Sequence, residues 1–206
     1  MYIRITRDKE VQVTAPSSVP REEVFRFIEE KKAWIQRNLS RMPETVNYDY
    51  HQGELHYFLG KRYVLHFYNS KESWLDLQDR QLMVGVSGRV RNRERLYVRL
   101  MKEELRQVIL RLMNQWIPMM KVVPSDIHIK IMKSRWGSTN VKTGELCFAL
   151  DLVTKPEECI ETVVVHEMNH LLETGHTRRF HRLMKGWLPD YREREKLLSS
   201  WPREFM

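Results

Sequence analysis

The chain contains, at residues 163–170, the stretch Val163-Val164-Val165-His166-Glu167-Met168-Asn169-His170. Its last five residues form an H-E-x-x-H motif in a run that favours a helix. Four residues of α-helix turn the chain by about 400°, so His166 and His170 project from nearly the same face and can bind one zinc ion. Glu167 projects about 100° away from His166, where it can deprotonate a metal-bound water. The motif therefore predicts metal-assisted hydrolysis, with a peptide bond as the first candidate.

The residues around the motif predict a capped helix with a defined end. Thr154 and Glu157 fit the S/T-x-x-E capping box, and Pro156 falls in the first turn, where its missing N–H costs little. Gly175 is the expected stop. Because three consecutive valines are poor helix formers, tertiary burial must hold this helix.

A third ligand is expected, because catalytic zinc usually takes three protein ligands and leaves one position for water. His176 follows Gly175, and a chain reversal at that glycine can bring His176 back to the motif histidines. Two rivals are His181, on the helix that follows, and Glu193, at a spacing used by zincins with a glutamate ligand. The plainer alternatives are histidines on a solvated face and a Glu167 that only orients a ligand.

The rest of the chain predicts an α+β fold. Residues 1–90 are expected to form a β-rich N-terminal lobe with one helix at 21–39 and strands at 2–5, 11–13, 55–58, 63–67, 75–77 and 82–86. Residues 91–206 are expected to form the catalytic region, with a helix at 94–116 that Pro118 ends. Strands at 127–131 and 146–150 can pair, and a last helix opens near Thr177.

Composition and charge narrow the class of protein. The 206 residues are 42% hydrophobic and 30% charged, as in ordinary globular proteins, and no apolar run is long enough to span a membrane. The first ten residues hold no signal-like stretch, so a cytoplasmic protein is expected. Cys147 and Cys159 do not form a C-x-x-C pair, which makes them free thiols rather than zinc ligands. The net charge of +8 favours anionic partners, but no nucleic-acid-binding motif accompanies it.

Two further side chains are candidates for substrate or transition-state contacts. Arg135 can hold a substrate carboxylate or phosphate beside the metal; alternatively, it pairs with a structural carboxylate while Trp136 lies in the core. Tyr191 can donate a hydrogen bond to the tetrahedral oxyanion, or it has a packing role.

The order and spacing of several segments resemble the YgjP-like metallopeptidase family, a bacterial zincin group related to SprT-like proteases. These segments are Ser134-Arg135-Trp136-Gly137-Ser138, the H-E-x-x-H helix, Gly175-His176-Thr177-Arg178-Arg179-Phe180 and Pro189-Asp190-Tyr191. The resemblance extends to Trp34-Ile35 and to residues 57–63, and so covers most of the chain. It implies a zincin-like domain with His166, His170 and His176 as zinc ligands and Glu167 as the catalytic base.

The chain departs from the family pattern at two positions, and it also differs from metzincins. Thr139 stands where the family commonly carries Cys, and His181 where it often has Trp. Neither residue is an expected metal ligand, so the assignment of the ligands is unaffected. The two departures leave open which residues line the cleft beside the metal. Metzincins share the spacing of the three histidines, but Glu173 stands where they carry Gly.

These observations indicate three candidate functions. The leading prediction is a zinc metallopeptidase acting on a peptide or protein. The second is a metal-dependent nucleotide phosphohydrolase of the nucleoside triphosphate pyrophosphatase type, favoured by the basic charge and Arg135 but lacking an acidic cluster for Mg²⁺. The third is a nucleic-acid-binding module with a structural zinc. A structural site needs no base, so Glu167 argues against that module, whereas kinship to SprT-like proteases leaves open a nucleic-acid-associated protease.

Overall fold

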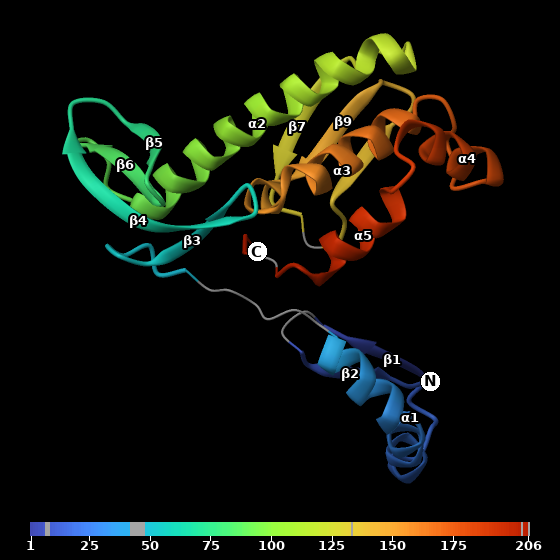
Figure 1. Ribbon diagram of the computed structural model, residues 1–206. Helices are drawn as coiled ribbons and strands as arrows, with labels where there is room; N and C mark the ends of the chain where they lie inside the picture. Colours follow the sequence, from blue (N-terminus) through green and yellow to red (C-terminus); the bar gives the residue numbers. More distant parts are fainter. Residues whose placement is uncertain (7–8, 42–47, 133, 203, 206) are drawn as a thin grey trace. The chain divides into compact units, whose positions relative to one another are not determined.

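The computed structural model describes residues 1–6, 9–41, 48–132, 134–202 and 204–205 (Figure 1). It contains two compact units, one of residues 1–46 with 200–203 and one of residues 47–199 with 204–206. The division into residues 1–90 and 91–206 that the sequence predicts stays a prediction.

The first unit consists of a hairpin and a helix. Strands β1 (Tyr2–Ile5) and β2 (Val11–Thr14) pair antiparallel, with Ile3 opposite Val13. Helix α1 (Arg21–Arg41) follows the hairpin. Ile3 and Ile35 are the buried apolar side chains that the structure describes in this unit.

The second unit contains two sheets. Strands β3 (Leu55–Phe58), β4 (Lys61–Ser70), β5 (Trp74–Gln78) and β6 (Gln81–Ser87) form a four-stranded sheet in the order β3-β4-β6-β5. Strands β7 (Asp126–Lys130), β8 (Gly137–Asn140) and β9 (Glu145–Ala149) form a three-stranded sheet in the order β7-β9-β8. The two strands predicted at 127–131 and 146–150 therefore do pair, and they pair in parallel. Strand β8, on the other side of β9, is an addition that the sequence did not reveal.

Helix α2 (Arg93–Met120) packs against both α3 (Glu157–Asn169) and the 3₁₀ helix η1 (Leu150–Thr154), and it also contacts β6 (Figure 1). Helices α4 (Arg178–Trp187) and α5 (Tyr191–Ser200) complete the unit. Its core joins α2, η1, α3 and both sheets, with fully buried residues that include Leu65, Met101, Ile109, Phe148 and Val164. The described residues thus form the α+β fold that the sequence predicts, with a β-rich region before the motif helix. No helix among them is long and apolar enough to cross a membrane.

Helix α3 is held by burial, as its three valines require. Val163, Val164 and Val165 are 7%, 0% and 0% exposed. The predicted capping box is wrong: Pro156 occupies the N-cap position without a side-chain cap. The Thr154 hydroxyl instead donates to the backbone oxygen of Asp151, because it ends the preceding 3₁₀ helix. The expected capping side chain, Glu157, forms an ion pair with Arg111 on α2.

Two predicted helix ends are also wrong. Helix α2 continues past Pro118 to Met120, whose side chain is buried, and Lys121 then closes the helix in a left-handed conformation with φ 55°. Helix α3 ends at Asn169, before Gly175, and Gly175 does not adopt the positive φ of a helix-capping glycine. Residues 170–175 therefore connect the end of α3 to His176 without a single glycine stop.

Candidate active site

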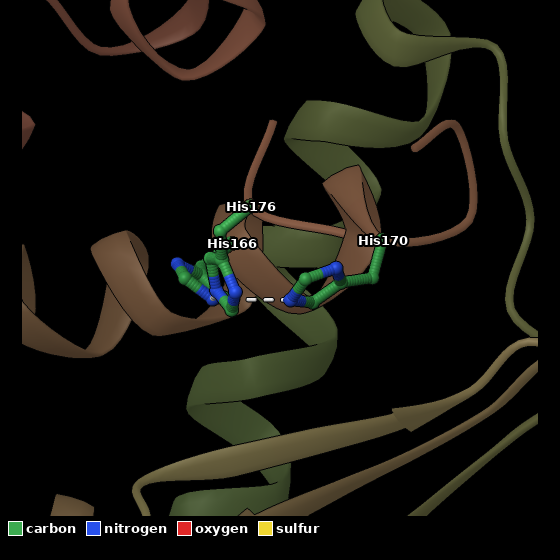
Figure 2. Close-up of side chains that lie close together, drawn as sticks. All are labelled: His166, His170 and His176. Carbon is green, nitrogen blue, oxygen red and sulfur yellow. Dashed lines mark hydrogen bonds between the residues drawn. The ribbon is translucent and has the colours of Figure 1, made fainter. Parts of the chain in front are cut away.

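Three histidines converge at the end of α3. The Nε2 atom of His166 lies 3.2 Å from Nε2 of His170 and 3.0 Å from Nε2 of His176 (Figure 2). The first lies in the last turn of α3, the second is the residue that caps this helix at its C-terminus, and the third comes from the loop before α4. The structure thus brings together the three residues that the sequence selects as metal ligands.

The donor set fits a zinc ion. Nδ1 of His170 lies 3.2 Å from the backbone oxygen of Glu173. Because a carbonyl oxygen only accepts, Nδ1 carries the hydrogen and Nε2 of the neutral ring presents a lone pair to the other two imidazoles. Nitrogen ligands of a tetrahedral zinc ion lie about 3.3 Å apart, given Zn–N bonds of roughly 2.0–2.1 Å, so the observed spacing suits a cation between them.

Burial keeps the first histidine neutral. Its removal from water and, to a smaller extent, the neighbouring His170, His176 and His181 lower the pKa of His166 to about 4. A neutral imidazole is the form that binds a metal. The site is therefore poised to accept a cation near neutral pH.

Phe180 packs against all three imidazole rings. Its ring centroid lies 4.9 Å, 4.7 Å and 4.8 Å from those of His166, His170 and His176, and its side chain is 1% exposed. Thr177 caps α4 by accepting the N–H of Phe180, and the amide of the buried Asn169 donates to the backbone oxygen of Phe180. These bonds fix the apolar support on which the three rings rest.

The Glu167 carboxylate is held against strand β8. Glu167 is 5% exposed, and the Thr139 hydroxyl lies 2.7 Å from its Oε2 atom. A Cβ atom built on Gly137 would lie 2.5 Å from Oε1, so only glycine leaves room for the carboxylate there. Burial raises the pKa of Glu167 to about 7, and the Thr139 hydrogen bond and the charge of Arg135 oppose that rise. This carboxylate can exchange a proton near neutral pH.

A cavity of about 700 Å³ opens beside these groups. Its lining comes from the segment that ends in β8, from α3 and its following loop, and from α5. The predicted contact residue Arg135 lines it, together with Trp136, and so do the three histidines and Glu167. Glu195, Leu198 and Ser199 of α5 also line the cavity, and the sequence had not selected any of them.

The other sequence candidates lie outside this lining. Tyr191 is 4% exposed, and its hydroxyl lies 3.2 Å from Nδ1 of His181 and 3.1 Å from Nε of Arg192. Its role towards the oxyanion stays a prediction. Glu193 is exposed on α5, and neither it nor His181 belongs to the histidine cluster.

The described residues contain a second group that could hold a cation, Asp49, His51 and Glu54. However, the Glu54 carboxylate already accepts the backbone N–H groups of Asp49 and Tyr50, at 2.9 Å and 2.8 Å, and also contacts His56. Its function is thus to shape the turn before β3, and the histidine cluster is the stronger metal site.

Comparisons with known proteins identify the family of the chain. The family model described as YgjP-like, metallopeptidase domain, matches residues 1–200. No curated protein matches the chain. A solved structure, the crystal structure of the metallopeptidase zymogen of Pyrococcus abyssi abylysin, is 16% identical with a TM-score of 0.42 over 48% of this chain and 99% of that chain. Because the family model covers nearly the whole sequence, the chain belongs to the YgjP-like metallopeptidase family.

Proposed function

We propose that the protein is a zinc-dependent metallopeptidase in which Glu167 is the general base. Membership of the family supports a metal-dependent peptidase that acts on a peptide or protein. The observation that carries the finer proposal is the convergence of three imidazole Nε2 atoms beside a buried carboxylate of raised pKa.

His166, His170 and His176 would hold the zinc ion. Three neutral imidazoles form a recurrent ligand set of catalytic zinc and leave a fourth position open. When bound, zinc polarises a carbonyl oxygen and makes water more acidic. The exposed side chain of His176 and the cavity beside the cluster allow the ion to enter from solvent.

Glu167 would take a proton from the attacking water and later deliver it to the departing amine. Its burial and its contact with Gly137 and Thr139 keep the carboxylate in one place on the cavity wall. A pKa of about 7 lets the same group accept and release a proton near neutral pH. Glu167 lies beside the proposed zinc ligands but is not one of them, which suits the role of a general base.

Strand β8 would bind the peptide substrate along its free edge. It is one of the two edge strands of the three-stranded sheet in the described residues. Ala149 N donates to Trp136 O at 2.8 Å, so the alternation of an antiparallel ladder directs the backbone polar groups of Gly137 and Thr139 away from β9. An extended peptide can pair with such an edge. Arg135, at the start of this segment, would contact a substrate carboxylate.

The test measures metal content and peptide hydrolysis on the same purified protein. Glu167→Gln should retain zinc and lose casein hydrolysis, because it removes the base and leaves the ligands. His176→Ala should lower zinc content markedly, while Glu193→Ala, the exposed rival, should not. Persistent activity in Glu167→Gln would contradict the role of the base.

The substrate class is tested in parallel with a nucleoside triphosphate. Casein hydrolysis that depends on both zinc and Glu167 supports the peptidase. Release of phosphate or pyrophosphate without casein hydrolysis would contradict it and favour the phosphohydrolase alternative.

A further inference from the structure

Helix α5 brings an acidic side chain to the histidine cluster. Oε1 of Glu195 lies 4.0 Å from Nδ1 of His166, and Glu195 lines the cavity. Nδ1 is the ring nitrogen that faces away from the cluster, since Nε2 of His166 contacts the other two imidazoles. The carboxylate therefore lies behind this imidazole and not among the metal-facing atoms.

The position of Glu195 is fixed by its helix. The preceding residue, Arg194, pairs with Glu161 of α3 at 2.6 Å and with Asp190 at 2.9 Å. On the same face of α5 as Glu195, Leu198 is buried at 3% exposure. These contacts hold α5 against α3, and Glu195 of α5 projects towards His166 of α3.

We propose that Glu195 is a positioning residue that accepts the Nδ1 hydrogen of His166 and so directs the Nε2 lone pair of that ring to the metal. This inference rests on the proposed metal site. The gap of 4.0 Å is about one ångström longer than a hydrogen bond, and the Glu195 side chain is 46% exposed, so a small rotation of that side chain would close the gap. His170 has the equivalent arrangement, in which Nδ1 donates to the backbone oxygen of Glu173. Acceptors behind metal-binding histidines fix the ring tautomer and raise its basicity.

The same helix supplies a matched control. Glu193 lies two residues before Glu195, carries the same charge and is exposed. Glu195→Ala and Glu193→Ala remove the same charge from the same helix, and only Glu195 lines the cavity near His166. Glu195→Gln keeps the shape and a neutral acceptor, and it should fall between wild type and Glu195→Ala.

The first measurement is the zinc dissociation constant, obtained by competition with a chromogenic chelator. Glu195→Ala should bind zinc about 10- to 100-fold more weakly than wild type, and Glu193→Ala should bind it like wild type. Melting temperatures of the metal-free proteins show that the variants are folded. Equal zinc affinity in the two alanine variants would overturn the inference.

The second measurement is the tautomer of His166 in metal-free protein, read from ¹⁵N NMR of the imidazole. Hydrogen on Nδ1 should dominate in wild type and Glu193→Ala and should decline in Glu195→Ala. An unchanged tautomer would also overturn the inference. Failure of wild-type protein to bind zinc would refute the proposed metal site instead, and the tautomer would still report on Glu195.

Discussion

The Thr139 hydroxyl on β8 lies 2.7 Å from Oε2 of Glu167 and 2.8 Å from the backbone oxygen of the same residue. A hydroxyl has one hydrogen to donate, and an ionised carboxylate is the stronger acceptor of the two. Thr139 therefore stabilises the ionised form of Glu167, against the burial that raises its pKa. One side chain on a neighbouring strand thus sets part of the proton affinity of the proposed base.

Thr139→Val should move the acid limb of the kcat/KM profile to higher pH. The substitution keeps the shape of the side chain and removes the donor, so the ionised carboxylate loses a hydrogen bond and the Glu167 pKa rises. The expected shift is about one pH unit, equivalent to ~1.4 kcal/mol. Thr139→Ser, which keeps the hydroxyl, should retain the wild-type limb. Superimposable profiles for the valine variant and wild type would refute the link.

Gly137→Ala should reduce peptide hydrolysis about 10- to 100-fold and leave the protein folded. The new Cβ would lie 2.5 Å from Oε1 and 2.7 Å from Cγ of Glu167, and the flexible end of the glutamate can move aside. Gly186→Ala on α4 is the control, since a Cβ there meets nothing within 4 Å. Activity assays and melting temperatures of both variants check the prediction. Wild-type activity in Gly137→Ala would show that the carboxylate need not occupy its observed position.

The sequence predicted the part of the site that depends on local geometry. The spacing of His166 and His170 implies one helix face whatever surrounds the helix, and the structure has that arrangement. The contact of Glu167 with Gly137 and Thr139 depends on how β8 docks on α3, across about thirty residues of chain. Glu195 was missed for the same reason. Its neighbours in sequence are charged, and only the packing of α5 against α3 distinguishes it from Glu193.

The predicted fold class is confirmed, but two local predictions within it are wrong. Thr154 is at the position expected of a helix-capping residue, but its hydroxyl donates to the backbone oxygen of Asp151 in the preceding turn. Pro118 is a residue type that commonly ends a helix, but α2 continues for two more residues, to Met120. Alternating or periodic apolar residues predicted the elements more reliably, because such patterns reflect which side chains are buried in the core. The strands predicted at 127–131 and 146–150, for example, do pair.

Phe180→Ala should weaken zinc binding as well as stability. The ring is buried under all three imidazoles, so its removal leaves a cavity that lets the ligands reorient. The free energy of unfolding should fall by about 3–5 kcal/mol. Met184→Ala is the control, because Met184 is fully buried on the same helix and its loss should cost about 2–5 kcal/mol. Chelator competition and chemical denaturation separate the two effects. Equal zinc affinity in both variants would show that Phe180 serves only the core.

His56 should make the folded protein less stable as the pH falls below about 6.5, the ordinary pKa of histidine. It is fully buried, stacks on Tyr48 with ring centroids 3.8 Å apart, and lies with Nε2 2.9 Å from Oε2 of Glu54. Burial lowers its pKa, although Glu54 opposes the change. The unfolded chain therefore takes up a proton at a higher pH than the folded chain does. The contribution of His56 is fully present above about pH 6.5 and declines towards the lower folded pKa, by up to 1.36 kcal/mol per pH unit.

The measurement is the free energy of unfolding of chelator-treated protein from pH 7 down to about pH 5, for wild type and His56→Phe. Phenylalanine keeps a ring to stack on Tyr48 and cannot take up a proton. The two proteins differ only at residue 56, so the difference between the two curves reports on His56. Glu54 has a lowered pKa and loses its contribution only at more acidic pH, below its ordinary value, which separates the two windows. The wild-type curve should fall more steeply with acid than the variant curve. Parallel curves would mean that His56 has the same proton affinity folded and unfolded.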